Sequence, residues 1–144
     1  MNIRPASLED ESKIINLLKA FPGQDGLVDW EAGAPTFRRI LEQPELGSIF
    51  VADDDGDVVG VITLSYPTCI RCCGIYSSIE EFIVSERCRG KGVGVQLLQT
   101  AIEEARMRGC YEIQVNNPSQ MGYPVYLRCG FHDIGKHLKM DFIK

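Results

Sequence analysis

One hexapeptide of this chain combines the residue types that can hold a phosphate group, Arg89-Gly90-Lys91-Gly92-Val93-Gly94. It follows an apolar stretch, residues 79–84, that predicts a strand, and it opens an amphipathic stretch that predicts a helix over 93–108. The glycines leave backbone N–H groups uncovered where the helix dipole is positive, and such a place binds phosphate. Arg89 and Lys91 add positive charge beside it. The segment therefore predicts a diphosphate-binding loop.

Two common phosphate-binding patterns do not match this hexapeptide. A dinucleotide fold requires G-x-G-x-x-G directly after its first strand. Here the third glycine comes one residue too early, and several predicted strands precede it. A P-loop requires G-x-x-x-x-G-K followed by Ser or Thr, and the sequence contains no such run. After an apolar strand, Arg89, Gly92 and Gly94 instead resemble the R/Q-x-x-G-x-G/A pattern of the acyl-coenzyme A loop of the GNAT superfamily of N-acetyltransferases.

A second motif lies downstream, where Tyr126 is followed four residues later by Gly130-Phe131. With the glycine hexapeptide, with Ile79–Val84 before it and with Ile3–Ala6 near the start, this motif makes the chain resemble the GNAT superfamily of N-acetyltransferases. The resemblance covers nearly the whole chain. The distance between the two motifs leaves room for one helix, one strand and one short helix, as in that family.

The resemblance implies an α/β (α+β) GNAT-like fold, with a mixed, mostly antiparallel central sheet flanked by helices and a parallel pair of strands around the coenzyme-binding loop. Residues 1–144 would form one domain, a length that suits a single core. It also implies an enzyme that transfers the acetyl group of acetyl-CoA to a primary amine of a small molecule or peptide, by direct attack in a ternary complex. Two alternatives stay open: a non-catalytic acetyl-CoA sensor or interaction module, and an acyltransferase of the same fold with another acyl donor.

The same resemblance implies where the coenzyme binds. The main chain of Phe82, Ile83 and Val84 would pair with the pantetheine arm as a strand does, and the Val84 N–H would polarise the acetyl carbonyl. Family members often carry asparagine seven residues before the tyrosine, where this chain has Ser119, with Asn117 slightly earlier. The implied cofactor-binding residues are Phe82, Ile83, Val84, Arg89, Gly90, Lys91, Gly92, Val93, Gly94, Asn117 and Ser119.

Acetyl transfer needs a neutral amine, a donor to the developing oxyanion and a proton for the departing thiolate. By its place in the motif, Tyr126 is the expected general acid; the alternative is a core tyrosine. Glu80 and Glu81 are the candidate bases, because a carboxylate in a partly apolar cleft has a raised pKa. Adjacent strand residues point to opposite faces, so Glu80 would share a face with Phe82 and Val84, and Glu81 with Ile83. The alternative for either is a solvated strand-end glutamate.

The loop between the first two predicted helices often lines the acceptor cleft in this family. Here it carries Asp25, Asp29, Trp30 and Glu31. Trp30, Asp29 and Glu31 are the substrate-binding candidates, for a cationic amine steered by the acids and stacked on the indole. The alternative, a solvated acidic loop anchored by Trp30, stays open.

Composition narrows the partners. The net charge of −5 disfavours nucleic acid, and no apolar run approaches the roughly 20 residues of a membrane helix. The N-terminal residues lack a signal-peptide core, so we expect a cytoplasmic protein. Homodimers are common in the family, but the sequence shows no interface stripe. The resemblance implies a small-molecule or peptide amine as the partner.

Six cysteines raise the question of a metal site or a disulfide framework. Cys69, Cys72 and Cys73 cluster as C-x-x-C-C, and the others are dispersed. A structural zinc site usually needs a second spaced pair, and disulfide frameworks belong to small secreted domains. We therefore expect reduced thiols and no metal.

The remaining pattern predicts elements that follow one another without a linker. Ser7 and Asp10 form an S-x-x-D start signal for a helix that extends to Ala20. The acidic residues 53–57 predict a hairpin turn rather than a calcium loop. The predicted strands are 2–5, 48–52, 58–66, 75–84, 111–115, 131–134 and 138–143, and the other predicted helices are 36–41, 93–108 and 122–129.

Overall fold

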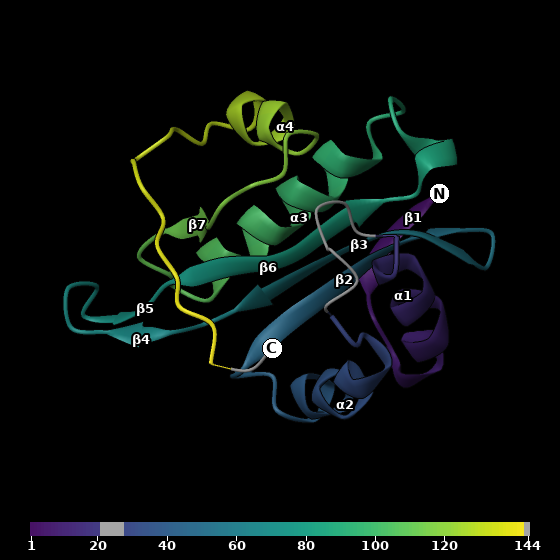
Figure 1. The fold of residues 1–144 in the computed structure, drawn as a ribbon, viewed down its shortest axis with the longest axis horizontal. Helices are drawn as coiled ribbons and strands as arrows, with labels where there is room; N and C mark the ends of the chain where they lie inside the picture. Colours follow the sequence, from purple (N-terminus) through teal and green to yellow (C-terminus); the bar gives the residue numbers. More distant parts are fainter. Residues whose placement is uncertain (21–27, 143–144) are drawn as a thin grey trace.

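The computed structural model describes residues 1–20 and 28–142. A five-stranded sheet forms its centre, in the order β1-β2-β3-β6-β7, and a two-stranded hairpin, β4–β5, extends from it (Figure 1). The strands are β1 (Asn2–Pro5), β2 (Gly47–Asp54), β3 (Asp57–Ser65), β4 (Thr68–Cys69), β5 (Gly74–Ile75), β6 (Ser77–Val84) and β7 (Ile113–Val115). The helices are α1 (Glu11–Leu18), α2 (Ala34–Glu42), α3 (Val93–Met107) and α4 (Tyr123–Arg128). Single 3₁₀ turns span Leu8–Asp10, Glu31–Gly33 and Glu86–Cys88.

Helices cover both faces of the sheet, α1 and α2 on one and α3 and α4 on the other (Figure 1). The alternation of side chains along each strand explains the two cores. In β2, Ile49 and Val51 pack with α1 and α2, whereas Phe50 and Ala52 pack with α3. The α3 side is the larger core, and Leu97 and Leu98 are fully buried in it.

The sheet is antiparallel except where β7 joins it. β6 and β7 run parallel, with Ser77 opposite Ile113 and Ile79 opposite Val115, and α3 makes the crossover between them. This confirms the predicted mixed sheet with a parallel pair beside the glycine loop. Beyond Ile79, β6 continues to Val84 without β7 beside it. The carboxyl half of β6 therefore has an open edge.

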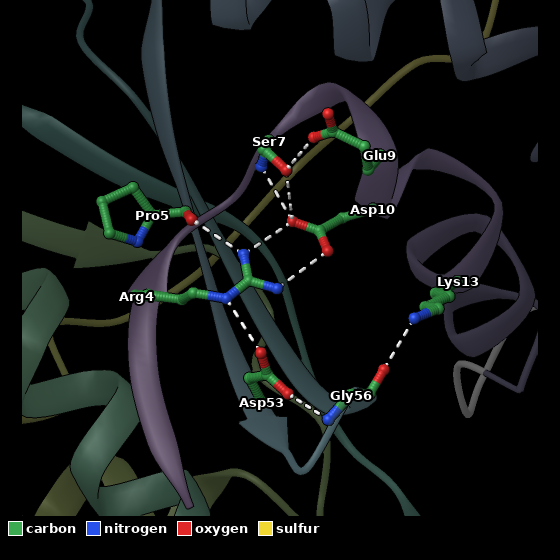
Figure 2. Close-up of polar contacts among 8 residues, drawn as sticks. All are labelled: Arg4, Pro5, Ser7, Glu9, Asp10, Lys13, Asp53 and Gly56. Carbon is green, nitrogen blue, oxygen red and sulfur yellow. Dashed lines mark hydrogen bonds and ion pairs between the residues drawn. The ribbon is translucent and has the colours of Figure 1, made fainter.

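An ion cluster joins the first strand, the start of the first helix and the β2–β3 turn (Figure 2). The Arg4 guanidinium donates to both carboxylate oxygens of Asp10, at 2.8 and 2.9 Å, and its Nε donates to Asp53 at 3.0 Å. Asp10 also accepts from the backbone N–H of Ser7, which completes the predicted capping box. The Asp53 carboxylate in turn accepts from the N–H of Gly56. The turn thus has the Asp-Gly geometry that the sequence predicted, with positive φ at both Asp55 and Gly56.

Several predicted boundaries shift by a few residues. The helix expected to reach Ala20 ends at Leu18, and the second helix begins at Ala34, with Pro35 in its first turn, where proline is favoured. The strand predicted over 75–84 is divided, because Ile75 pairs in the β4–β5 hairpin and β6 begins at Ser77. Asp25 and the predicted helix end near Pro22 lie outside the described residues.

The two predicted closing strands, 131–134 and 138–143, are wrong within the described part of the chain. Residues 131–142 form neither a helix nor a strand. Four large apolar side chains of this segment, Ile134, Leu138, Met140 and Phe142, are 78% to 91% exposed. Alternation predicts that a segment can pair as a strand, but pairing also needs a neighbouring edge, and the segment joins none here. We call residues 131–142 the C-terminal tail.

No helix among residues 1–20 and 28–142 has both the length and the hydropathy needed to cross a bilayer.

Candidate active site

A cavity of about 300 Å³ opens between the carboxyl half of β6, the glycine loop and α4. Its lining comes from three separate parts of the sequence, brought together where β6 and β7 diverge. The lining residues are Phe82, Ile83, Val84, Cys88, Arg89, Gly90, Gly92, Val93, Gly94, Val95, Ser119, Met121, Gly122, Val125 and Arg128. Every residue predicted to bind the coenzyme, except Lys91 and Asn117, therefore lines this cavity.

The glycine loop has the backbone that its sequence predicts. Gly90 and Gly92 both adopt positive φ, 79° and 81°, where a side chain would be strained. Gly92 is the N-cap of α3, and its carbonyl accepts the first intrahelical bond, from Gln96. The N–H groups before Gln96 at the start of α3 have no carbonyl of their own helix to bind. They face the region that Arg89 and Gly94 line, and this arrangement favours an anion.

The main chain of β6 offers hydrogen-bonding groups on the other side of the cavity. The N–H of Ser85 donates to the Val59 carbonyl at 2.7 Å, which fixes the alternation of the β3–β6 ladder. Ile83 then bonds toward β3, whereas Phe82 and Val84 direct their main-chain groups to the open edge. The Val84 carbonyl accepts from Nε of Arg89 at 3.2 Å. The remaining groups of Phe82 and Val84 are available to a ligand along this edge.

A β-bulge in β6 changes the expected placement of the two glutamates. Glu81 lies opposite Thr63 and Ile79 opposite Leu64, so Glu80 is an extra residue in β6. The Glu80 carboxylate accepts from the Ser65 hydroxyl at 2.7 Å, and the Glu81 carboxylate accepts from the Thr63 hydroxyl. Thr63 and Ser65 are two residues apart in β3 and share a face. Both glutamates therefore lie on the face that α1 and α2 cover.

This corrects the sequence-based expectation that Glu80 shares a face with Phe82 and Val84. The side chains of Phe82 and Val84 share a face, as predicted, and pack with the α3 core. Glu81 lies on the same face as Ile83, also as predicted. The expectation for Glu80 was wrong because it assumed an unbroken strand, and the bulge rotates the residues before it. The chain thus presents two adjacent carboxylates on one face instead of one on each.

The two carboxylates differ in environment. Burial raises the pKa of Glu81, the hydrogen bond from Thr63 lowers it, and the negative charge of Glu80 raises it further. The net pKa of Glu81 lies above the usual value for a glutamate. Glu80 is exposed to solvent. A half-buried carboxylate of raised pKa beside an exposed one is better suited to accepting a proton than an ordinary glutamate.

Tyr126 is buried on α4, and its ring packs between Phe82 and Phe131, with centroid distances of 5.7 and 5.3 Å. Burial raises the pKa of its hydroxyl, so the group stays protonated at neutral pH. Within the described residues no hydrogen bond binds this hydroxyl to a partner. The ring lies behind the cavity lining: Phe82 and Gly122 line the cavity, and both contact Tyr126. Tyr126 is thus a neutral donor placed one side chain from the cavity.

The three acceptor candidates lie elsewhere. Trp30 packs against the core beneath α1 and α2. Asp29 accepts from the N–H of Ala32 at 3.2 Å, and Glu31 forms an ion pair with Lys19. None of the three lines the cavity. Their contact with an acceptor stays a prediction.

Some lining residues escaped the sequence analysis. The most informative is Arg128, in the last turn of α4, because it is a second arginine in the lining besides Arg89. Its signal was a basic residue inside the motif, between Tyr126 and Gly130, which is equally typical of a surface charge. The other unpredicted lining residues are Cys88, Val95, Met121, Gly122 and Val125.

Comparison with known proteins gives this geometry a family. The model of the acetyltransferase (GNAT) family matches residues 13–131, which include β6, the glycine loop and Tyr126. The chain belongs to this family. The resemblance that the two motifs predicted is thereby confirmed.

Two N-acetyltransferases are similar to this GNAT protein along most of its length. Glucosamine 6-phosphate N-acetyltransferase 1 of Oryza sativa subsp. japonica is 29% identical, over 96% of this chain and 84% of that protein. The aminoalkylphosphonate N-acetyltransferase of Salmonella typhimurium is also 29% identical, over 90% and 83%. A predicted acetyltransferase from Clostridium acetobutylicum, solved with acetyl-CoA, shares the fold, with a TM-score of 0.84 at 22% identity over 97% of this chain and 95% of that one.

The residues around the cavity fit acetyl-CoA, which carries a diphosphate and an extended arm with amide groups. Uncovered N–H groups at the start of α3, together with Arg89 and Arg128, suit the diphosphate. The open edge of β6 at Phe82 and Val84 suits an arm that pairs as a strand does. A Cβ atom at Gly94 would lie 3.4 Å from the Phe82 ring, so helix and strand already approach closely at this point. The cavity therefore has positive charge at the glycine loop and free main-chain groups along the neighbouring edge of β6.

Proposed function

We propose that this GNAT protein transfers the acetyl group of acetyl-CoA to a primary amine of a small molecule or peptide, by direct attack while both are bound. The observation that carries this proposal is the composition of β6. Its carboxyl half provides two adjacent carboxylates, Glu80 and Glu81, and then main-chain groups that face the cavity at Phe82 and Val84. A base for the amine and an anchor for the donor therefore belong to one rigid strand.

Acetyl-CoA would supply the activated acetyl group. The chain's own part is to hold it, with Arg89, Arg128 and the first N–H groups of α3 at the diphosphate. Lys91 and Asn117 do not line the cavity, but Lys91 lies between two lining residues, Gly90 and Gly92, and Asn117 lies two residues before Ser119, so we assign them to its outer part. The Val84 N–H would donate to the acetyl carbonyl, where negative charge develops.

The glutamate pair would prepare the acceptor. An amine must lose a proton before it can attack, and a carboxylate accepts that proton best when its pKa is near the working pH. Glu81 meets this condition better than an ordinary glutamate, because burial and the charge of Glu80 raise its pKa. Glu80, exposed and bound to Ser65, would attract the ammonium form to the site.

Tyr126 would return a proton to the departing thiolate. Its pKa is raised by burial, so the hydroxyl is protonated when the donor binds. Its contact with Phe82 places it beside the strand whose main chain would hold the pantetheine arm. Because both substrates can be bound at once, no covalent acetyl-enzyme is needed, and proximity supplies much of the acceleration.

The acceptor class is the least defined part of this proposal. The rice and Salmonella relatives are named for glucosamine 6-phosphate and for aminoalkylphosphonates, both amines with a phosphorus-bearing acid. Asp29, Trp30 and Glu31 instead favour a cationic amine without such a group. An acceptor panel should therefore contain phosphorylated amino sugars, aminoalkylphosphonates, polyamines, aminoglycosides, and N-terminal and lysine peptides.

The test is acetyl transfer from acetyl-CoA to this panel, followed by mass spectrometry of the acetylated products. Product detection avoids interference from the six thiols of the chain. Turnover of one acceptor class would support the proposal, and a parallel series of longer acyl-CoA donors would identify the preferred acyl group. Tight acetyl-CoA binding without any acetylated product would contradict it and favour the sensor alternative.

The same proposal includes a homodimer. The C-terminal tail carries four large apolar side chains in water, and burying each would contribute about 1.5–3 kcal/mol. β7 has β6 on one side, and among residues 1–20 and 28–142 none pairs with its other edge. A tail with the alternating apolar pattern of a strand and an unpaired strand edge on the same chain would be complementary halves of an interface between two copies.

A further inference from the structure

The β4–β5 hairpin holds three cysteines near its turn, at the end of the molecule where it leaves the central sheet (Figure 1). Cys69 is the last residue of β4 and lies opposite Gly74 of β5. The N–H of Cys73 donates to the Ile70 carbonyl at 3.0 Å, which closes the turn. Ile70, at the tip, is 98% exposed. The cysteines thus lie on an ordered turn that solvent reaches.

The thiols in this turn are not equivalent. Cys72 is buried, Cys69 is partly buried and Cys73 is exposed. Burial and direct interaction with the Cys69 thiol raise the pKa of Cys72 to about 11. The turn therefore brings the side chains of Cys69 and Cys72 together, and it leaves Cys73 facing a different environment.

A fixed cation accompanies this pair. The Arg71 guanidinium donates to both carboxylate oxygens of Glu112, at 2.9 and 3.5 Å, and lies 5.3 Å from the centre of the Tyr76 ring. Interaction with the Cys72 and Cys69 thiols contributes to the raised pKa of Arg71. Two anchors from outside the turn hold the guanidinium beside the sulfurs, and a nearby guanidinium stabilises a thiolate.

From this geometry we propose that Cys69 and Cys72 form a reversible disulfide by exchange with small-molecule disulfides. Two thiols on one ordered turn, two residues apart in the sequence and with an anchored guanidinium between them, suit this exchange. This site is separate from the acetyl-CoA cavity, because none of the three cysteines lines that cavity. The proposal does not depend on the proposed transferase function.

The exchange is balanced in two steps. The Cys69 thiolate attacks one sulfur of a disulfide RSSR, and RS⁻ leaves. The Cys72 thiol then loses its proton, its sulfur attacks Cys69, and the second RS⁻ leaves. The two protein thiols lose two electrons, and RSSR gains them and, with the two protons, becomes two RSH. Burial slows attack by Cys72 from solution, so Cys69 reacts first and Cys72 resolves.

Trypsin offers a direct test, because Arg71 separates the two cysteines. Cleavage after Arg39, Arg71 and Arg87 places Cys69 in the peptide 40–71, and Cys72 with Cys73 in the peptide 72–87. The folded protein would be equilibrated with glutathione disulfide, its free thiols blocked with N-ethylmaleimide, and the products digested without reduction. The expected result is a cross-linked pair of these peptides, two hydrogens lighter than their sum, and reversal by dithiothreitol.

Cys73→Ser is the matched control, since it removes a neighbouring thiol and should leave the cross-linked pair unchanged. Cys69→Ser and Cys72→Ser should each abolish the cross-link, and Cys72→Ser should retain glutathione on Cys69. Three outcomes would overturn the proposal: an intact 72–87 peptide with Cys72 joined to Cys73, a cross-link lost in Cys73→Ser, or full N-ethylmaleimide labelling of both cysteines at equilibrium. The wild-type digest decides the first and third without any variant.

Discussion

Glu80 and Glu81 lie side by side on one face of the sheet, because the bulge opposite Thr63 makes Glu80 an extra residue in β6. Each carboxylate has its own hydroxyl partner in β3, Ser65 for Glu80 and Thr63 for Glu81. The pairing couples their charges, and the negative charge of Glu80 helps to raise the pKa of Glu81. A site with two coupled carboxylates allows its base to be tested in two opposite directions.

The pH dependence of acetyl transfer should move oppositely in two variants. A base works when deprotonated, so kcat/KM should rise with pH through the pKa of Glu81, above the usual range for glutamate. Thr63→Val removes a bond that lowers this pKa, and the acidic limb should move to higher pH. Glu80→Gln removes a charge that raises it, and the limb should move to lower pH.

The control for this pair is Glu81→Gln, which should remove the limb and lower kcat/KM about a hundredfold or more. If the limb survives in Glu81→Gln, another group is the base. Movement of both other variants in one direction would show that they act through general disruption of the strand.

Replacing Tyr126 by phenylalanine should lower kcat by roughly a hundredfold or more, because the thiolate loses its proton donor. The ring contacts with Phe82 and Phe131 survive this change, so the Kd of acetyl-CoA should stay nearly constant. Turnover and isothermal titration would be measured in parallel. Tyr123→Phe, on the same helix but partly exposed, is the matched control and should change neither quantity. Equal turnover of Tyr126→Phe and wild type would reduce Tyr126 to a core residue.

Alanine at Gly92 should weaken acetyl-CoA binding several-fold. Gly92 caps α3 with φ of 81°, and a non-glycine residue there costs about 1–2 kcal/mol, which the loop would relieve by shifting. Gly33→Ala is a suitable control, because Gly33 has an ordinary α-helical φ and nothing lies within 4 Å of the position that the new methyl group would take. The Kd of acetyl-CoA, measured by titration, would be compared between the two variants and the wild type. Unchanged affinity in Gly92→Ala would mean that the start of α3 does not hold the diphosphate.

Sequence patterns predicted those parts of the site that depend on local backbone. The glycine loop was predictable because Gly90 and Gly92 occupy positions of positive φ, and glycines at such spacing in the sequence indicate a backbone of this kind. The face of Glu80 was not, because it depends on one extra residue in β6 against the neighbouring strand β3, and alternation alone does not announce a bulge. The strand prediction for the C-terminal tail was wrong for a related reason. Leu138, Met140 and Phe142 alternate as in a strand, but alternation does not specify which strand edge the segment would pair with.

Acid should weaken the fold through Asp10. Its bonds with Arg4 lower its pKa from 3.8 to about 2 (Figure 2). A lowered folded-state pKa stabilises the protein above the unfolded value, and this contribution, about 2 kcal/mol, is lost as pH falls from about 4 to 2. Urea unfolding of Asp10→Asn at pH 7 should show a comparable loss of stability and a flatter pH dependence. Glu45→Gln, an exposed position, is the control. If the unfolding free energy of Asp10→Asn depended on pH in the same way as that of the wild type, this role of Asp10 would be contradicted.

Removing apolar side chains from the C-terminal tail should dissociate the proposed dimer. Leu138→Ser with Phe142→Ser deletes two of the four exposed apolar side chains, and these make no contribution to the described cores, so a folded monomer should result. Light scattering after size exclusion would measure the mass of wild type and variant. Ile70→Ser is the matched control, because Ile70 is equally exposed but lies on the β4–β5 turn. A monomeric wild-type protein would contradict the proposed dimer. A dimer that dissociates in Ile70→Ser but persists in the tail variant would show that the interface does not include the tail. A dimer lost only in the tail variant would show that these side chains are covered by a second copy.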